Sequence, residues 1–368
     1  MPKQVKPEIE SFAKIKVIGA GGSGCNAVSR MVSSKIKGVD FIGVNTDAQA
    51  LHYCKAPEKI LIGKNVTHGL GAGMNVDLGR KAVEESKEEI EEALKGADMV
   101  FVTCGLGGGT GTSSIPVIAE IARNLGALTI GVVTKPFSFE GANRQAIAEQ
   151  GLAELEDKVD SLIVIPNDKV LMMIDDKTSL LSAFAIVDNV LSNAVQAISD
   201  LIVKPGLINL DFADIRTIMK DSGFALIGIG KAKGEGRIIE AAKMAISSPL
   251  LEVSIDGAKG LLLNISGKED LTMKEVDEGA KIITKAVDPE AKIIFGTVLD
   301  ESLTKGEVRI TVIATNFNHI PNIRKENNSS KDIDKNRRNE FNNNNFSEEQ
   351  DLNDDKWDVP AFLRKKDN

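Results

Sequence analysis

The chain has 368 residues, enough for two domains with cores of their own. Its formal net charge of −8 argues against nucleic acid as the main partner, because phosphate backbones bind basic surfaces. The three cysteines and three histidines lack metal-binding spacing, so we expect reduced cytosolic thiols and no metal cluster. Residues 1–12 are charged without an apolar core, and no apolar run reaches about 18 residues, which predicts neither a signal peptide nor a membrane-spanning helix.

The first glycine-rich loop follows a predicted strand at residues 14–18 and opens a helix. Its sequence is Gly19-Ala20-Gly21-Gly22-Ser23-Gly24, which satisfies the GxGxxG pattern. With Asp40 downstream as a ribose contact, a dinucleotide site is one interpretation. A second glycine loop later in the chain weakens it, because a dinucleotide site needs only one such turn.

Further strand–loop–helix units follow in the same order. Residues 41–45 predict a strand, and Thr46-Asp47 the capped start of a helix. A third glycine turn at residues 69–73 precedes a helix expected from about residue 76 to residue 94. The acidic run of that helix is interpreted as a solvated face.

The most glycine-rich stretch is Gly105-Leu106-Gly107-Gly108-Gly109-Thr110-Gly111-Thr112-Ser113-Ser114. It lies between a buried strand predicted at residues 99–103 and a helix expected to carry Pro116 in its first turn. Backbone N–H groups of such a loop and of the helix N-terminus converge on anions, and the helix dipole adds partial positive charge. Three of its hydroxyls can donate to phosphate oxygens, those of Thr110, Thr112 and Ser113. A phosphate site is therefore favoured over a flexible turn.

Strands at residues 128–134 and 161–166 complete the first domain, and residues 135–141 turn into a helix that carries Arg144. Strands alternating with helices predict an α/β domain with a mostly parallel sheet. Its site is expected in the loops at the carboxyl ends of the strands.

Residues 178–199 predict a long helix whose only charge is Asp188. So few charges indicate a helix buried on most sides, and its serines, asparagines and glutamine argue against a membrane span. We interpret it as a spine between two domains that ends at Lys204-Pro205-Gly206.

A second, α+β domain is expected from about residue 205 to residue 317. Strands are predicted at 225–229, 261–265, 292–295 and 308–313, and helices at 237–247 and 273–286, with one face of the sheet more exposed to water. Beyond residue 318 the chain is rich in Asn and charge and predicts a disordered linker.

The end of the chain is apolar again at residues 357–366, which include its only tryptophan. A chance cluster is the less favoured interpretation. A tethered docking peptide is preferred, with Pro360 starting a helical turn that displays Phe362 and Leu363.

Asp211 and Asp214 begin a predicted helix and share a face. An acid at a helix start with a second acid three residues later is typical of a capping pair, worth about 1 kcal/mol, and spacing alone favours that interpretation. The alternative is that the two carboxylates polarise a water for attack on a terminal phosphate.

With these motifs together, the chain resembles the FtsZ family, the bacterial relatives of tubulin, along essentially its whole length. Residues 107–113 resemble the family signature, with Ser113 in place of the usual last glycine, and the first loop resembles the family's glycine run with Ser23 and Cys25 inside it. The resemblance implies a parallel-sheet GTP-binding domain and an α+β domain joined by a long central helix. The boundaries implied are 1–12 for an N-terminal tail, 13–178, 179–204 for the helix, 205–317, 318–355 for a disordered linker, and 356–368 for a docking peptide.

The resemblance also implies roles for individual residues. The nucleotide-binding set is Gly21, Gly22, Ser23, Gly24, Cys25, Asn26, Gly71, Ala72, Gly73, Gly107, Gly108, Gly109, Thr110, Gly111, Thr112, Glu140, Arg144, Phe184 and Asp188. Glu140 and Arg144 would reach the ribose, while Phe184 would stack on guanine and Asp188 would read it. Asn209, Asp211 and Asp214 would act on the nucleotide of the neighbouring subunit. The tail residues that would dock partners are Trp357, Val359, Pro360, Phe362 and Leu363.

The function implied is a polymerisation-activated GTPase that forms head-to-tail filaments of the cell-division ring, in the cytoplasm near the inner face of the membrane. GTP or GDP would be bound with Mg²⁺, whose ligands the sequence does not assign. The partners implied are other copies of the chain and membrane-tethering division adaptors, with no nucleic acid and no insertion into the membrane. Two alternatives stay open: an oxidoreductase that binds its dinucleotide at Gly19–Gly24, and a nucleotide-binding scaffold without catalysis.

Overall fold

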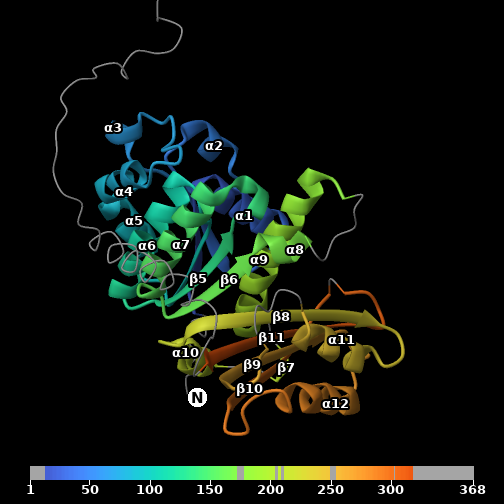
Figure 1. The fold of residues 1–368 in the computed structure, drawn as a ribbon. Coiled ribbons are helices and arrows are strands. Elements are labelled where there is room, and N and C mark those ends of the chain that lie inside the picture. Colours follow the sequence, from blue (N-terminus) through green and yellow to red (C-terminus); the bar gives the residue numbers. More distant parts are fainter. Residues whose placement is uncertain are drawn as a thin grey trace, which may run out of the picture. The chain divides into compact units, whose positions relative to one another are not determined.

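The computed structural model describes residues 13–171, 178–203, 206–208, 211–248, 254–301 and 303–317. Six parallel strands form the first part of the sheet, in the spatial order β3-β2-β1-β4-β5-β6. Figure 1 labels the last two of them, β5 and β6. Their bounds are β1 Ile15–Ala20, β2 Val39–Asn45, β3 Glu58–Leu61, β4 Met99–Gly105, β5 Leu128–Lys135 and β6 Ser161–Pro166. The predicted parallel sheet is confirmed, and β3 is an addition because its four residues are too few for a recognisable pattern.

The helices that connect these strands are α1 Gly21–Ser33, α2 Ala48–Tyr53, α3 Lys64–Thr67, α4 Val76–Glu85, α5 Lys87–Leu94, α6 Gly109–Asn124, α7 Ala142–Glu156 and α8 Asn167–Leu171. The prediction of a single helix over residues 76–94 is wrong. The segment is divided into α4 and α5 at Ser86, whose hydroxyl accepts a hydrogen bond from the Gly63 N–H at 3.3 Å.

Helix α6 also begins earlier than expected, at Gly109 inside the glycine loop. Pro116 therefore lies within the helix and not in its first turn. The loop and the helix are one unit, so the helix N-terminus lies among the glycines themselves.

Helix α9, Leu180–Val203, is the long helix predicted from its lack of charge. It is long and apolar enough to cross a membrane, but 61% of its most apolar window is buried inside the protein. Its apolar side chains, such as Val195 and Ile198, pack in one core cluster with strands of the first sheet and with Leu262 and Val298 of the second. It is therefore a core helix between the two halves, as expected.

The second half consists of β7 Gly206–Ile208, α10 Phe212–Met219, β8 Gly223–Lys233, α11 Arg237–Ile246, β9 Ala258–Gly267, α12 Met273–Thr284, β10 Lys292–Leu299 and β11 Glu307–Phe317. Its strands follow the order β8-β11-β9-β10-β7, with β9 and β10 parallel and β11 antiparallel to both neighbours. β6 joins β8 through three residue pairs that begin at Ser161 and Gly223. The α+β architecture is as predicted, except that the short β7 was not expected.

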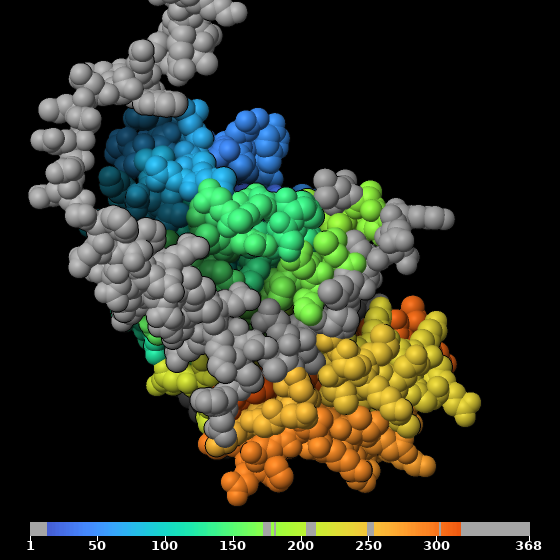
Figure 2. All heavy atoms as spheres, viewed as in Figure 1, coloured from blue at the N-terminus to red at the C-terminus, as the bar shows by residue number. Residues whose placement is uncertain are grey.

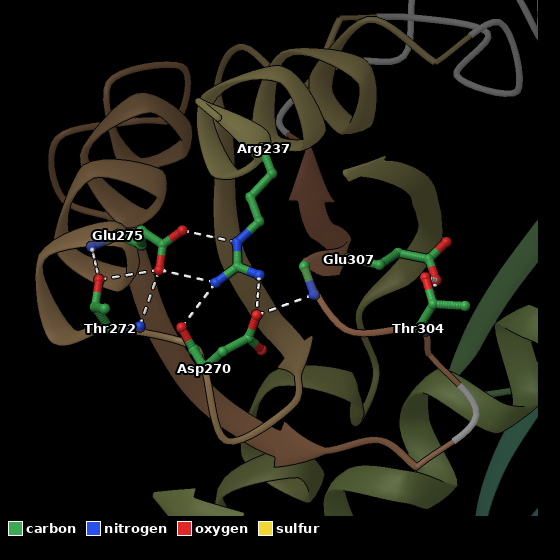
Figure 3. Close-up of polar contacts among 7 residues, drawn as sticks. Arg237, Asp270, Thr272, Glu275, Thr304 and Glu307 are labelled. Atoms are coloured by element: carbon green, nitrogen blue, oxygen red, sulfur yellow. Dashed lines mark hydrogen bonds and ion pairs between the residues drawn. The ribbon is translucent and has the colours of Figure 1, made fainter. Parts of the chain in front are cut away.

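Helices α11 and α12 lie side by side on this second sheet, and their gold and orange atoms form a continuous surface in Figure 2. An ion cluster fixes their N-termini (Figure 3). The buried Arg237 guanidinium donates to Glu275 at 2.7 Å and to Asp270 at 2.8 Å, and Asp270 also accepts from the Gly306 N–H. Thr272 and Glu275 form a capping box at the start of α12. The hydrogen bond from Arg237 lowers the pKa of Glu275 to about 2.

Candidate nucleotide-binding site

The three glycine loops predicted from the sequence meet at the carboxyl ends of the parallel strands. Gly21 adopts a φ of 73°, and a Cβ there would lie 2.9 Å from the backbone nitrogen of Gly111. The Gly109 N–H donates to the Gly73 carbonyl at 2.9 Å, which joins the third loop to the second. Only glycine permits such close backbone approach, so the three loops form one surface.

One side of this surface is open. A Cβ added to Gly22, Gly73 or Gly108 would meet no atom within 4 Å. Helices α1 and α6 both begin here, at Gly21 and Gly109, and neither start is capped by a side chain in the described part of the chain. The Gly109 N–H is taken by the Gly73 carbonyl, but the other N–H groups of these first turns have no capping side chain among the described residues, and the aligned dipoles favour an anion.

Two of the predicted hydroxyl donors face inward instead of toward this open side. Thr112 Oγ1 accepts from the Gly107 N–H at 2.9 Å, and Ser113 Oγ donates to the Gly109 carbonyl at 2.7 Å. Each residue is 1% exposed. The expectation that these hydroxyls donate to phosphate is corrected, because they hold the loop in shape. Thr110 is half-buried and its hydroxyl lies 2.6 Å from that of Thr46.

The departures from the family pattern have local explanations. Ser113 can be accommodated because it faces Gly79 of α4, which has no side chain. A Cβ added to Gly79 would lie 2.3 Å from the Ser113 hydroxyl oxygen. Ser23 is exposed, and its hydroxyl accepts from the Gly105 N–H at 2.8 Å, which ties the first loop to the second. The Cys25 thiol is buried and lies near the Val44 carbonyl, so only its backbone can face a nucleotide.

Cys25 also contacts the buried thiol of Cys54. The hydrogen bond between the two thiols, together with burial, raises the pKa of Cys25, whereas the same bond lowers the pKa of Cys54 to about 5.

A pocket of about 430 Å³ adjoins the first loop. Phe184 and Asp188 of α9 line it, opposite Asn26 and Arg30 of α1. Asp188 Oδ2 lies 3.3 Å from Arg30 Nε, and burial raises the pKa of Asp188 although the Arg30 charge opposes that shift. Phe184 is 41% exposed and packs edge to face on Phe137. An exposed aromatic ring beside a partly desolvated carboxylate suits a flat base with N–H donors.

Glu140 and Arg144 lie together beside the signature loop. They form an ion pair at 2.8 Å, and Glu140 also accepts from the Phe137 N–H at 2.9 Å. The Arg144 Nε is buried and has no hydrogen-bond partner among the described residues. A Cβ on Gly107 would lie 2.8 Å from the Arg144 carbonyl, so α7 begins directly against the loop. The orphaned donor is consistent with a ligand that these residues would share.

Asp211 and Asp214 do not join this site. Both are exposed, and Asp211 stands at the N-cap of α10 without a side-chain capping bond in the described residues. The capping interpretation is therefore wrong for Asp211 in this structure. Arg216 of the same helix donates to the carbonyl of Gly126, which precedes β5. Helix α10 thus lies at the amino end of β5, opposite the glycine loops. Asn209 and residues 357–363 are outside the described residues.

Comparisons with known proteins identify the family. The model of the Tubulin/FtsZ family GTPase domain matches residues 14–175, and that of the FtsZ family C-terminal domain matches residues 223–318. The chain belongs to the tubulin/FtsZ family. As a member of its FtsZ branch it is a GTPase with the two-domain tubulin/FtsZ fold, and the oxidoreductase and non-catalytic scaffold alternatives are set aside.

Solved structures agree with this assignment. An FtsZ dimer from M. jannaschii is 48% identical over 83% of this chain and 89% of its own, with a TM-score of 0.80. A tryptophan-to-tyrosine mutant of FtsZ from the same organism is 49% identical over 83% and 91% of the two chains, with a TM-score of 0.79. CetZ1 from Haloferax volcanii, described as a GDP-bound monomer, is 21% identical over 87% and 99%, with a TM-score of 0.74, and shows the fold alone.

Sequence reasoning missed part of the pocket that Phe184 and Asp188 line. Arg30 and Tyr53 line it without having been expected. Arg30 lies four residues after Asn26 on α1, so helical spacing from that residue was a usable signal. Tyr53 is the only tyrosine of the chain, but nothing in its surroundings indicates which way it faces.

The described residues contain no group of three or more His, Cys, Asp or Glu side chains able to hold a metal ion. A metal held by protein carboxylates alone therefore does not fit this FtsZ-family site. A Mg²⁺ ion could fit only as a companion of the nucleotide's phosphates, with the half-buried Thr110 hydroxyl, which is bonded to that of the buried Thr46, as a candidate oxygen ligand from the chain.

Proposed function

We propose that this GTPase works as a head-to-tail filament, in which Asp211 and Asp214 of one subunit, with Asn209, complete the site of the next. The observation that carries the proposal is the position of the two exposed carboxylates at the sheet edge opposite the glycine loops. β5 has eight residues, so roughly 26 Å separates the two edges. Side chains on α10 cannot span that distance to the nucleotide of their own subunit.

A contact between the carboxylate end of one subunit and the loop end of another joins two different surfaces. Such heterologous contacts do not close on themselves and build open filaments. The FtsZ from M. jannaschii is described as a dimer, and a relative that self-associates supports self-association of this chain.

Each part of the site would have a separate task. The glycine loops would bind the phosphates through backbone N–H groups, Asp188 would accept from guanine N–H groups, and Glu140 with Arg144 would hold the ribose. The incoming carboxylates would orient a water for in-line attack on the terminal phosphate. When bound, Mg²⁺ would neutralise charge on the phosphate oxygens.

Dilution and mixing test the shared site. Turnover per subunit should rise with protein concentration and vanish below the assembly range. Asp211→Ala should bind GTP and assemble but hydrolyse little. Mixing it with Asp188→Ala, whose weakened site stays largely empty at limiting GTP, should restore activity at mixed junctions. Glu240→Ala is the matched control, since Glu240 is an exposed acid in the first turn of α11. A constant turnover per subunit on dilution would refute the proposal.

The cellular setting we propose is the cell-division ring, in the cytoplasm near the inner face of the membrane. The support is membership of the FtsZ branch. Residues 357–363 would act as a tethered peptide for membrane-linked adaptors, because a lone tryptophan in a polar tail has no core to enter.

A further inference from the structure

The C-terminal end of α10 is bonded to the amino edge of the nucleotide-binding sheet. The Ser161 hydroxyl, on the first residue of β6, donates to the Met219 carbonyl at 2.5 Å. It lies 2.6 Å from the Ser222 hydroxyl. A serine hydroxyl has one proton, so Ser222 must be the donor in that second bond. Ser161 is fully buried and Ser222 is 7% exposed, which keeps both bonds out of water.

The neighbouring backbone adds to this connection. The Asp160 carbonyl accepts from the N–H groups of Ser222 at 2.8 Å and Gly223 at 3.1 Å. The Asp160 carboxylate is buried and accepts from the Thr129 N–H at 2.8 Å, which fixes Asp160 to β5. Asp160, Ser161 and Ser222 therefore form a small buried cluster, here named the α10 anchor.

Two arginines connect the C-terminal end of α6 and the segment before β5 to the region of the α10 anchor. Arg123, in the last turn of α6, pairs with Asp221 and lies 3.8 Å from the Asp160 carboxylate. Arg216 reaches the Gly126 carbonyl at 3.3 Å. α6 begins in the signature glycine loop, so one helix joins the phosphate loop to the anchor.

The last turn of α10 is thus held firmly while its first turn projects. Ile215, Ile218 and Met219 are at most 1% exposed, whereas Asp211 and Asp214 are exposed. Eight residues separate Asp211 from Met219, or about 12 Å at the helical rise. A tilt of about 5° at the anchor would move the Asp211 end by about 1 Å, and a displacement of that size can cost about 100-fold in rate.

We propose that Ser161, Ser222 and Asp160 are positioning residues for the GTPase reaction. They set the angle at which α10 presents Asp211 and Asp214 to the nucleotide of the next subunit. This inference rests on the proposed shared site. It adds that residues buried inside one subunit determine how accurately its carboxylates are placed in the site of the next subunit.

The test compares Ser161→Ala and Ser222→Ala with a matched buried serine. Ser199→Ala is the control, because Ser199 is fully buried in α9 and its hydroxyl bonds to the Val195 carbonyl of its own helix. Both anchor variants should bind GTP normally and sediment with GTP, but turnover per assembled subunit should fall about 10- to 100-fold. The Ser199 variant should keep its turnover even if its melting temperature falls.

Mixing distinguishes a misplaced α10 from damage to the variant's own nucleotide site. Ser161→Ala mixed with Asp188→Ala should regain activity, because an intact α10 then meets a filled site. Ser161→Ala mixed with Asp211→Ala should not, because neither protein offers a working α10. The reverse pattern, or unchanged turnover in both anchor variants, would overturn the positioning role. Failure of Asp211→Ala with Asp188→Ala to recover would instead refute the shared site itself.

Discussion

Replacing Asp188 by asparagine should change nucleotide preference without unfolding the protein. The Asp188 side chain is 18% exposed and pairs with Arg30, whose own side chain is 37% exposed. Burial raises the pKa of Asp188, so the folded state binds its proton more tightly than the unfolded chain does. The stability gained because the folded state binds this proton more tightly is present below the usual pKa of a carboxyl group. It is lost as pH rises through the raised pKa of Asp188. Near neutral pH the ionised carboxylate therefore costs stability, and Asp188→Asn should not lower the melting temperature of the nucleotide-free protein.

The loss of GTP affinity follows from the hydrogen bonds at stake. Guanine offers an N1–H and an amino group, and an ionised carboxylate can accept from both. Hydrogen bonds to a charged group contribute about 1.5–3 kcal/mol, which corresponds to roughly 10- to 150-fold in dissociation constant. Xanthine carries a carbonyl where guanine has its amino group. An asparagine can accept from N1–H and donate to that carbonyl, so the variant should bind XTP better than the parent does.

Competition against a fluorescent GTP analogue, at protein concentrations below assembly, measures both affinities. Asp277→Asn serves as the control, because Asp277 is an exposed acid on α12 in the other half of the chain. Equal GTP affinity in parent and Asp188→Asn, with no gain for XTP, would remove Asp188 from the base pocket.

Three further predictions concern the ion cluster, the loops and the tail. Arg237→Ala should destabilise the protein by about 3–5 kcal/mol, the scale for breaking a buried ion pair, and should lower the melting temperature. Because Arg237 lowers the pKa of Glu275 to about 2, the stability that Glu275 contributes is present above its usual 4.5 and is lost in acid titrations as pH falls through about 2. Gly21→Ala should abolish GTP binding, since its Cβ would lie 2.9 Å from the Gly111 nitrogen, whereas Gly22→Ala should fold normally. Deleting residues 355–368 should leave GTP turnover unchanged in phosphate-release assays; a truncated chain still captured by adaptor-bearing vesicles would contradict the docking role.

The strands and glycine loops of the first half could be predicted because their signals are local. Apolar runs such as residues 99–103 and 128–134 are buried on both faces of a parallel sheet, so composition alone marks them. The glycine-rich residues 105–111 come directly after the first of these runs, which places them at the carboxyl end of a strand. Asp188 was informative as well, since a charge in a buried helix needs a partner. The observed helix extends beyond residue 199 and carries a second, buried charge, Asp200, which the predicted range left out.

The orientations of individual side chains could not be predicted, because they depend on contacts distant in sequence. Thr112 and Ser113 turn inward since α6 begins at Gly109, and that start is fixed by a bond to Gly73. The break at Ser86 depends in the same way on Gly63. No spacing rule relates these partners.

The mutual contacts of the three glycine loops have a thermodynamic consequence. Because Gly21 lies against Gly111 and Gly109 is bonded to Gly73, contacts within the chain itself fix the arrangement of the three glycine loops. Ordering a disordered loop would cost about 1–2 kcal/mol per residue in backbone entropy, and a preformed one avoids that cost. Calorimetry of GTP binding to the monomer should therefore show the small heat-capacity change of a rigid site, without the large negative value that accompanies coupled folding.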